Sequence, residues 1–242
     1  MRSDLANALD PDYLHLIVHP TEQCNFQCTY CYERFDIGRM PPEIVGGITR
    51  LLGRRHDLRQ LSIGWFGGEP LVAMDVIRKI SRAAQNHCAL HGIDYSADMT
   101  TNGYRLTPAL GRELIGLGVG TYQISLDGDA ECHDQTRLKA NGDGTFQTIW
   151  SNLEGLLGTD LEFEAMLRIH YHADNLDSID RPIDRLVAAF PGDQRLRLYF
   201  KNVSPLGSAN DKHFPFVAAE RRKAVERRFA DRVDGRLPVL GG

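Results

Sequence analysis

The sequence predicts an α/β fold built on a parallel β-sheet. Strand-like and helix-like segments alternate along the chain, and six such strand–helix units follow one another. Consecutive units of this kind form parallel sheets with right-handed crossovers, because each helix returns the chain to the start of the next strand. Six units are fewer than the eight of a standard barrel, so the pattern fits either an open doubly wound sheet or a partial barrel.

The predicted strands are short runs that are either apolar or alternate between apolar and polar residues. Runs of this length are typical of strands in α/β domains. In chain order they span residues 14–19, 61–66, 93–100, 120–126, 161–171 and 196–203.

The predicted helices carry apolar side chains at helical spacing, as Ile44, Ile48 and Leu51 do in the first of them. Prolines at 108 and 182 lie where the first turn of a helix accepts them. In chain order the helices span residues 42–56, 75–90, 108–117, 146–157, 179–190 and 216–233.

Length and charge limit the classes of function. The 242 residues suffice for one sizeable domain, and we expect a leader at 1–12, a core at 13–235 and a tail at 236–242. The net charge of −4 favours neither nucleic acid nor an anionic membrane as partner. No apolar run approaches the roughly 20 residues that cross a bilayer. Residues 1–11 are polar and acidic and contain no signal-peptide h-region, so we expect a cytoplasmic protein. In a reducing compartment, cysteines clustered in one loop indicate metal binding.

Three cysteines, Cys24, Cys28 and Cys31, follow the first predicted strand at C-x3-C-x2-C spacing. Thiolates this close can converge on zinc or on an iron–sulfur cluster. Structural zinc takes four protein ligands, and no fourth ligand is evident besides His19 on the strand. A four-iron cluster held by three cysteines leaves one iron open, where the amino and carboxylate groups of a methionine can chelate. A zinc-stabilised binding protein is the alternative.

The other predicted strands also end in polar or glycine-rich residues. Gly67 and Gly68 leave backbone open to a ligand, and Glu69 offers a carboxylate to a cation. Ser125 and Asp127 are two residues apart on one strand, so both side chains can face a ribose diol. Because the carboxyl ends of parallel strands meet at one edge, these residues are expected to share a ligand site.

The segment CNFQCTYCYE, residues 24–33, resembles the signature loop of the radical S-adenosylmethionine (radical SAM) superfamily. The resemblance runs over most of the chain. The strings WFGGEPL, TTNGY and QISLDG are most similar to SPASM-type maturases that modify ribosomally made peptides. This resemblance implies a partial (β/α)6 TIM-like barrel. It also implies two cofactors, S-adenosylmethionine and a [4Fe-4S] cluster bound by the three loop cysteines.

The resemblance also implies roles for individual residues. Tyr30 and the backbone of Leu206 would lie beside the adenine, and Glu69 would bind the amino group of the methionine moiety. The remaining cofactor contacts would come from Gly67, Gly68, Asn102, Ser125, Asp127 and Arg168, with Arg137 the rival of Arg168 for the cofactor carboxylate.

The implied reaction is oxidoreductase-type peptide modification. An external flavodoxin- or ferredoxin-like donor would reduce the cluster, and a 5′-deoxyadenosyl radical would take hydrogen from a precursor peptide or protein, leading to a cross-link. His133 and Asp134 are weak candidates for acid–base catalysis and also suit a structural loop.

Two further alternatives are open. One is a sulfatase-maturating enzyme, which forms formylglycine, and the other is an inactive scaffold. Relatives of this kind usually carry a C-terminal domain with auxiliary clusters. Because no cysteine follows Cys132, we expect that domain to be absent from this chain.

Overall fold

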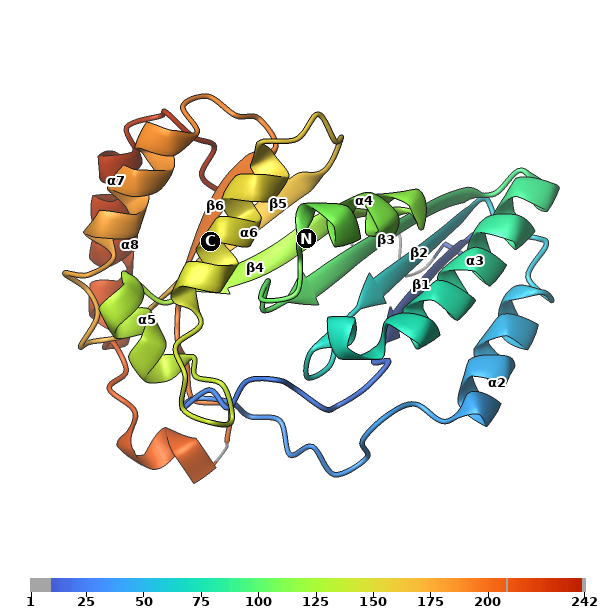
Figure 1. The fold of residues 1–242 in the computed structure, drawn as a ribbon, viewed down its shortest axis with the longest axis horizontal. Helices are drawn as coiled ribbons and strands as arrows, with labels where there is room; N and C mark the ends of the chain where they lie inside the picture. The colour runs from blue at the N-terminus through green and yellow to red at the C-terminus, as the bar shows by residue number, and fades with distance from the viewer. Residues whose placement is uncertain (1–9, 208, 241–242) are drawn as a thin grey trace. The chain divides into compact units, whose positions relative to one another are not determined.

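A computed structural model describes residues 10–207 and 209–240 (Figure 1). Its six strands lie in one parallel sheet in the chain order β1-β2-β3-β4-β5-β6, which confirms the predicted α/β class. The strands are β1 (Tyr13–Val18), β2 (Gln60–Trp65), β3 (Asp94–Thr101), β4 (Val119–Leu126), β5 (Glu164–Tyr171) and β6 (Leu196–Asn202).

Each predicted helix is present, and the ends differ by a few residues. The α-helices are α2 (Pro42–Leu52), α3 (Met74–His91), α4 (Pro108–Gly116), α5 (Ala130–Thr136), α6 (Phe146–Leu157), α7 (Asp180–Ala189) and α8 (Ala219–Val233). Two 3-10 helices, η1 (Pro70–Ala73) and η2 (Ala209–His213), complete the elements. Helix α5 falls in a stretch that the sequence predicts to be a loop. It forms because the Asp129 side chain caps its first turn, accepting a hydrogen bond from the Cys132 amide at 3.1 Å.

The chain divides into two compact units. The first comprises Met1–Cys24, Arg34–Thr101 and Ala109–Tyr122, and the second comprises Asn25–Glu33, Asn102–Pro108 and Gln123–Gly242. In the first unit β1, β2 and β3 pair in parallel, and α2 packs beside α3. The core of this unit is completely buried and contains Leu61, Ile63, Trp65, Ile77 and Ile80. Hydrophobic burial therefore stabilises the first unit around β2 and α3.

In the second unit β5 and β6 pair in parallel, with Arg168 opposite Tyr199. Alternate residues of β5 are fully buried and half-buried, so the two faces of this strand differ. The fully buried face carries Leu167 and Ile169. Tyr171, on the same face, packs edge-on against Phe229 of α8 at 5.7 Å between ring centroids. The half-buried face carries Arg168 and His170, which leaves these two polar side chains on the face not buried by α8.

A short C-terminal stretch pairs with β6. The Leu198 amide donates to the Pro238 carbonyl at 2.9 Å, and the Leu240 amide donates to the Leu198 carbonyl at 2.8 Å. Part of the predicted tail, residues 236–240, is thus attached to the sheet. The predicted leader lies mostly outside the described residues.

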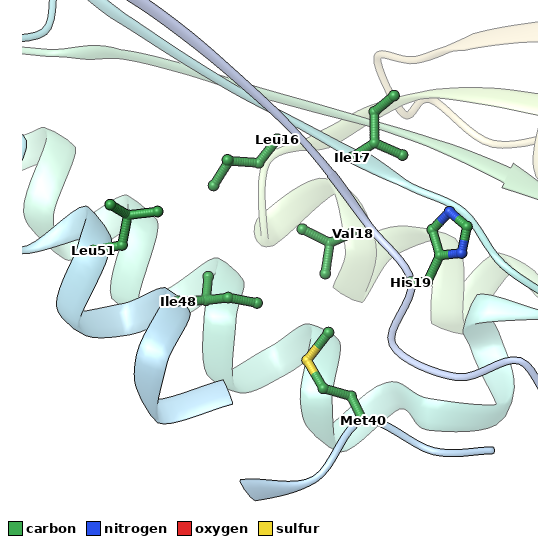
Figure 2. Close-up of a pocket in the computed structure, with 7 residues that line it drawn as sticks. All are labelled: Leu16, Ile17, Val18, His19, Met40, Ile48 and Leu51. Carbon is green, nitrogen blue, oxygen red and sulfur yellow. The ribbon is translucent and has the colours of Figure 1, made fainter. Parts of the chain in front are cut away.

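An apolar cavity of about 300 Å³ lies between β1 and α2 in the first unit (Figure 2). Its walls are aliphatic side chains such as Leu16, Val18, Ile48 and Leu51, with His19 as the one titratable lining residue. A wall of this composition does not supply catalytic groups. Within the described residues no helix combines the length and apolar character needed to cross a membrane.

Candidate active site

The cysteine loop follows β1. All five cysteines of the chain lie in the described residues and are reduced thiols, and Cys24, Cys28 and Cys31 are each half-buried. Cys24 ends a segment of the first unit, whereas Cys28 and Cys31 belong to the second. A turn closes the second pair, because the Cys31 amide donates to the Cys28 carbonyl at 3.1 Å. In the described part of the chain no three His, Cys, Asp or Glu side chains are already gathered around a metal position.

The segment before Cys24 is fixed by main-chain contacts to the glycines after β2. The Gly68 amide donates to the Thr21 carbonyl at 3.2 Å, and the Glu69 amide donates to the Gln23 carbonyl at 3.0 Å. A methyl group on Gly68 would overlap the carbonyl oxygens of Glu22 and Gln23. Gly67 has φ +115°, a left-handed conformation that favours glycine. Both glycines are therefore needed for the approach of the protein's own loop, and their predicted contact with the cofactor stays a prediction.

Glu69 is completely buried. Its Oε1 accepts hydrogen bonds from the Leu71 amide at 3.0 Å and from the Thr101 hydroxyl at 2.7 Å. The first of these caps the 3-10 helix η1. The carboxylate is thus held in one orientation by two elements that leave the carboxyl ends of β2 and β3, the edge at which the sequence predicts a ligand.

The second half of the cysteine loop is joined to residues 136–138 by main-chain hydrogen bonds. The Gln27 amide donates to the Leu138 carbonyl at 2.7 Å, and the Thr29 amide donates to the Thr136 carbonyl at 2.9 Å. Phe26 is buried and packs edge-on against Tyr104. Main-chain pairing thus immobilises the segment that contains Cys28 while leaving its thiol unused.

Asn102 also supports this loop. Its side-chain amide donates to Asn25 Oδ1 at 2.8 Å, and its own Oδ1 accepts the Tyr104 amide at 3.0 Å. Asn102 was predicted to line the cofactor pocket. In the structure it joins the cysteine loop to the turn after β3.

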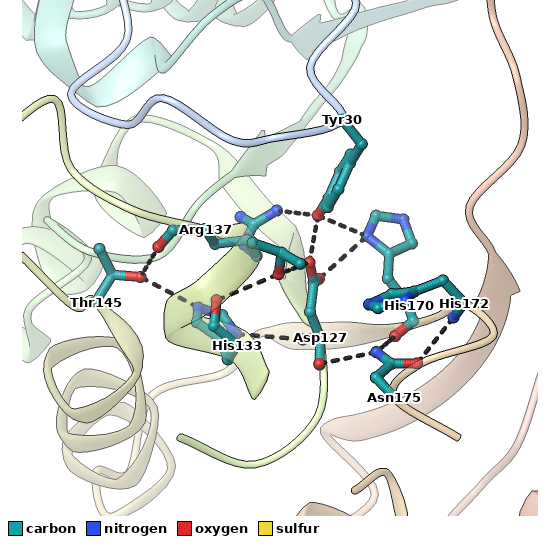
Figure 3. Close-up of polar contacts among 9 residues, drawn as sticks. Tyr30, Asp127, His133, Arg137, Thr145, His170, His172 and Asn175 are labelled. Atoms are coloured by element: carbon teal, nitrogen blue, oxygen red, sulfur yellow. Dashed lines mark hydrogen bonds and ion pairs between the residues drawn. The ribbon is translucent and has the colours of Figure 1, made fainter. Parts of the chain in front are cut away.

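Tyr30, between Cys28 and Cys31, joins a buried polar network around Asp127 (Figure 3). Its hydroxyl donates to Asp127 Oδ2 at 2.7 Å and accepts from the Arg137 guanidinium at 3.0 Å. Thr136 donates to the same carboxylate oxygen at 2.8 Å. His170 Nδ1 lies 3.4 Å from the other oxygen, Oδ1. Cys28 and Cys31, which flank Tyr30, are therefore connected through this tyrosine to the end of β4, to α5 and to β5.

The protonation states in this network follow from its charges. Burial opposes ionisation of Asp127, but the contact with His170 and the field of Arg137 outweigh burial and hold the pKa of that carboxyl well below its usual range. Burial lowers the pKa of His170 despite Asp127, so the imidazole is neutral near neutral pH. Burial also raises the pKa of the Cys28 thiol to about 11, an effect that Arg137 opposes.

His133 and Asp134 have structural partners. His133 is completely buried, and its Nδ1 accepts the Asp127 amide at 3.2 Å while Nε2 lies 3.2 Å from the Thr145 hydroxyl. Asp134 Oδ1 accepts hydrogen bonds from the amides of Thr145, the N-cap of α6, and Phe146, its first residue. Their predicted role in catalysis stays a prediction, while the contacts favour the structural role that the sequence also allows.

The remaining predicted residues lie on the strands and the loop after β6. Ser125 is buried near the end of β4. Arg168 donates to Gln123 Oε1 at 2.6 Å rather than to a nearby acid. Leu206 is 64% exposed, and its amide donates to Asp211 Oδ2 at 2.9 Å. Because the Leu206 amide already has this partner, it does not support the predicted contact between the Leu206 backbone and adenine.

The sequence did not single out Thr136 and Asn175. Thr136 donates to the Asp127 side chain, and Asn175 donates to the Asp127 carbonyl at 2.9 Å. Its position beside Arg137, a predicted contact of the cofactor carboxylate, is the sequence signal that could have indicated Thr136. Asn175 lies in a polar stretch after β5 and has no comparable signal.

Several buried polar atoms of the second unit lack a hydrogen-bond partner among the described residues. They include Oδ1 of Asp127, Nε of Arg137 and Nε of Arg168. A buried donor or acceptor left unpaired costs about 1–3 kcal/mol. S-adenosylmethionine offers complementary groups, because a carboxylate suits the arginine donors and a ribose hydroxyl suits the aspartate oxygen. The residues present therefore fit the predicted cofactor, and three reduced thiols fit the cluster.

Parallel strands with a three-thiol loop and buried unpaired charges define the core of a cofactor-dependent enzyme. The chain belongs to the Radical SAM superfamily, whose family profile matches residues 18–171. This match confirms the family that the resemblance of the cysteine loop predicts. The cofactors characteristic of this family are the predicted ones, S-adenosylmethionine and a [4Fe-4S] cluster.

Individual relatives are maturases. A cysteine-type anaerobic sulfatase-maturating enzyme of Clostridium novyi (strain NT) is 24% identical over 93% of this chain and 62% of its own length. The mycofactocin maturase MftC of Mycolicibacterium smegmatis is 28% identical over 66% of this chain and 38% of its own length. This chain thus spans less than two thirds of the curated relatives it matches.

A solved structure shares the fold. Native anSMEcpe with bound AdoMet and Cp18Cys peptide superposes with a TM-score of 0.72 at 20% identity, covering 95% of this chain and 63% of that one. Together with the six parallel strands, this likeness confirms the predicted fold class, a partial (β/α)6 barrel.

Replacing Gly68 by alanine should destabilise the protein by about 1–3 kcal/mol, because the new methyl group forces the Glu22 and Gln23 carbonyls to move. Urea unfolding of the metal-free protein measures this change. Gly116→Ala is the matched control, since its methyl group meets open space at the end of α4. Equal unfolding free energies for the two variants would contradict the close approach of loop and glycine.

Acid should weaken the fold through His133. Burial lowers its pKa from 6.5 to about 4, so between these values the unfolded chain binds a proton that the folded chain does not. The stabilisation is complete above pH 6.5 and is lost as pH falls toward 4, a loss of about 3 kcal/mol from this group.

Urea unfolding across this pH range tests the expectation, with His133→Gln as the comparison. The variant removes one titrating group, so its unfolding free energy should vary less steeply with pH than that of the wild type. His170 and His172, whose pKa values are also lowered, titrate in both proteins. Parallel curves for the two proteins would show that His133 titrates normally in the fold.

Proposed function

We propose that this chain is the catalytic core of a radical SAM maturase that modifies a peptide or protein substrate. The observation that carries the proposal is the reduced three-cysteine loop whose central residue, Tyr30, is bonded to Asp127 and Arg137. Cys24, Cys28 and Cys31 would be the protein ligands of the [4Fe-4S] cluster. When bound, the cluster and S-adenosylmethionine supply a 5′-deoxyadenosyl radical that takes hydrogen from the substrate.

The protein's own residues bind and orient these groups. Arg137 is buried near Cys28, and its positive charge offsets the charge of the thiolates that bind metal. The unpaired Nε of Arg168 would donate to the cofactor carboxylate, and Oδ1 of Asp127 would accept from a ribose hydroxyl.

The other contacts of the cofactor follow the resemblance. Glu69 would bind the amino group, and Tyr30 and Leu206 would border the adenine. Gly67, Gly68, Asn102 and Ser125 would complete the pocket, as the sequence predicts.

A peptide substrate is supported by the maturases among the relatives and by the peptide in the anSMEcpe structure. Within this class we propose cross-link formation on a ribosomal precursor peptide. Formylglycine formation is the second candidate, since a sulfatase-maturating enzyme aligns with 93% of the chain. An external flavodoxin- or ferredoxin-like protein would supply the electron, and reduced thiols suit a cytoplasmic location.

Cleavage of the cofactor tests the reaction class. After anaerobic reconstitution with iron and sulfide, dithionite and S-adenosylmethionine should give 5′-deoxyadenosine with the wild type and negligible amounts with Cys28→Ala, because the cluster loses a ligand. Cys132→Ala is the control, since this half-buried thiol is outside the loop and should leave the yield unchanged. Equal, negligible yields from wild type and Cys28→Ala would contradict the proposal for this chain.

The two candidate products differ in one functional group. A serine peptide that becomes formylglycine and a peptide that gains an internal cross-link both lose two hydrogens, so mass alone does not separate them. Formylglycine is an aldehyde and forms a hydrazone with a hydrazide reagent. We expect the modified peptide to leave the hydrazide unreacted, as measured by mass spectrometry. Hydrazone formation would instead favour the sulfatase-maturating activity.

A further inference from the structure

His172 follows β5, and its buried imidazole makes no hydrogen bond to the polar network around Asp127. It is 6% exposed. Both ring nitrogens, Nδ1 and Nε2, lack a hydrogen-bond partner among the described residues. Its one hydrogen bond in Figure 3 is made by the backbone, whose amide donates to Asn175 Oδ1 at 2.8 Å. A buried imidazole with two unpaired nitrogens is destabilising in the ligand-free protein, which indicates that a ligand pairs them.

The surroundings keep this imidazole neutral. Burial lowers the pKa of His172, and the neighbouring His170 acts in the same direction, while Asp127 and Asp174 oppose. A neutral imidazole presents one N–H donor and one acceptor nitrogen. A ligand can therefore pair either ring nitrogen, with an acceptor for the N–H or a donor for the other nitrogen.

Aromatic contacts connect His172 to Tyr30. The ring of Phe214 packs edge-on against His172 at 5.0 Å and against Tyr30 at 5.5 Å between centroids. Tyr30 is the residue that the loop resemblance puts beside the adenine. Phe214 therefore separates His172 from the adenine-side tyrosine by a single ring, and all three residues belong to the second unit.

The edge of adenine can pair with the ring nitrogen of His172 that faces it, because its amino group donates and its ring nitrogens accept, while its faces suit aromatic neighbours. We propose that His172 is a base-recognition residue that hydrogen-bonds the adenine edge of S-adenosylmethionine, with Phe214 bordering the same base. This assignment rests on the proposed function, because it uses the cofactor of that reaction. It adds to that function a polar determinant of base identity.

A recognition histidine and a structural histidine differ in the sign of their effect on stability. Replacing His172 by phenylalanine or leucine removes two unpaired buried nitrogens, so the ligand-free protein should melt at the same or a higher temperature. The same variants should weaken S-adenosylmethionine binding about tenfold in the anaerobically reconstituted full chain, as measured by calorimetry. His172→Gln, which keeps a donor and an acceptor, should recover part of the affinity.

Two comparisons make the test specific. His87→Phe is the matched control, because that half-buried histidine has its Nε2 at 3.2 Å from the Arg55 carbonyl. It should lower the melting temperature and leave cofactor binding unchanged. For base identity, the probes are 5′-deoxyadenosine and 5′-deoxyinosine. The wild type should favour the adenine compound, and His172→Phe should lose most of that preference.

The outcomes separate the two proposals. If the wild type binds S-adenosylmethionine and the His172 variants bind it equally well, the assignment of His172 is wrong and the proposed function stands. Loss of melting temperature comparable to that of His87→Phe would likewise show a structural histidine. If the reconstituted wild type binds no S-adenosylmethionine, the proposed function fails together with the assignment.

Discussion

The buried carboxylate of Asp127 is the constraint on which the arrangement of the second unit depends. An ionised group without exposure to water is tolerated only when other groups offset its charge and fill its hydrogen-bonding positions. Tyr30 and Thr136 donate to its Oδ2 directly, and Arg137 acts through Tyr30, while His170 Nδ1 lies 3.4 Å from Oδ1. These groups come from the cysteine loop, α5 and its C-cap, and β5. Satisfying one charge thus fixes the relative positions of three segments, including the loop that carries Cys28 and Cys31.

The cysteine loop shows a second, complementary solution. It contains almost no regular secondary structure, yet its backbone amides still need partners. Carbonyls of the loop meet amides at Gly68 and Glu69, and amides of the loop meet the carbonyls of Thr136 and Leu138. Main-chain hydrogen bonds therefore position this loop. This close main-chain contact explains why glycine is required at position 68, where a side chain would push the backbone away from the carbonyls of Glu22 and Gln23.

The fold could be predicted because strand and helix periodicities are local properties of the sequence, and the family because three cysteines at fixed spacing are rare by chance. The contacts around Asp127 could not be predicted, since its partner Tyr30 is distant in sequence and reaches it only after folding. The partner of Arg168 shows the same limit. Glu164, on the same strand as Arg168, pairs with Arg197, and Arg168 reaches Gln123 on another strand. Helix α5 was not predicted, because its seven mostly polar residues show no clear hydrophobic periodicity.

The pairing of residues 238–240 with β6 bears on how this protein can be handled. The free edge of a sheet exposes unpaired amides and carbonyls, which can recruit strands from other molecules and lead to aggregation. Here a few residues joined at Leu198 shield part of that edge. Expression boundaries drawn upstream of Leu237 would uncover it without touching any cofactor residue. Loss of solubility after such trimming would then report an unprotected strand, not a damaged catalytic centre.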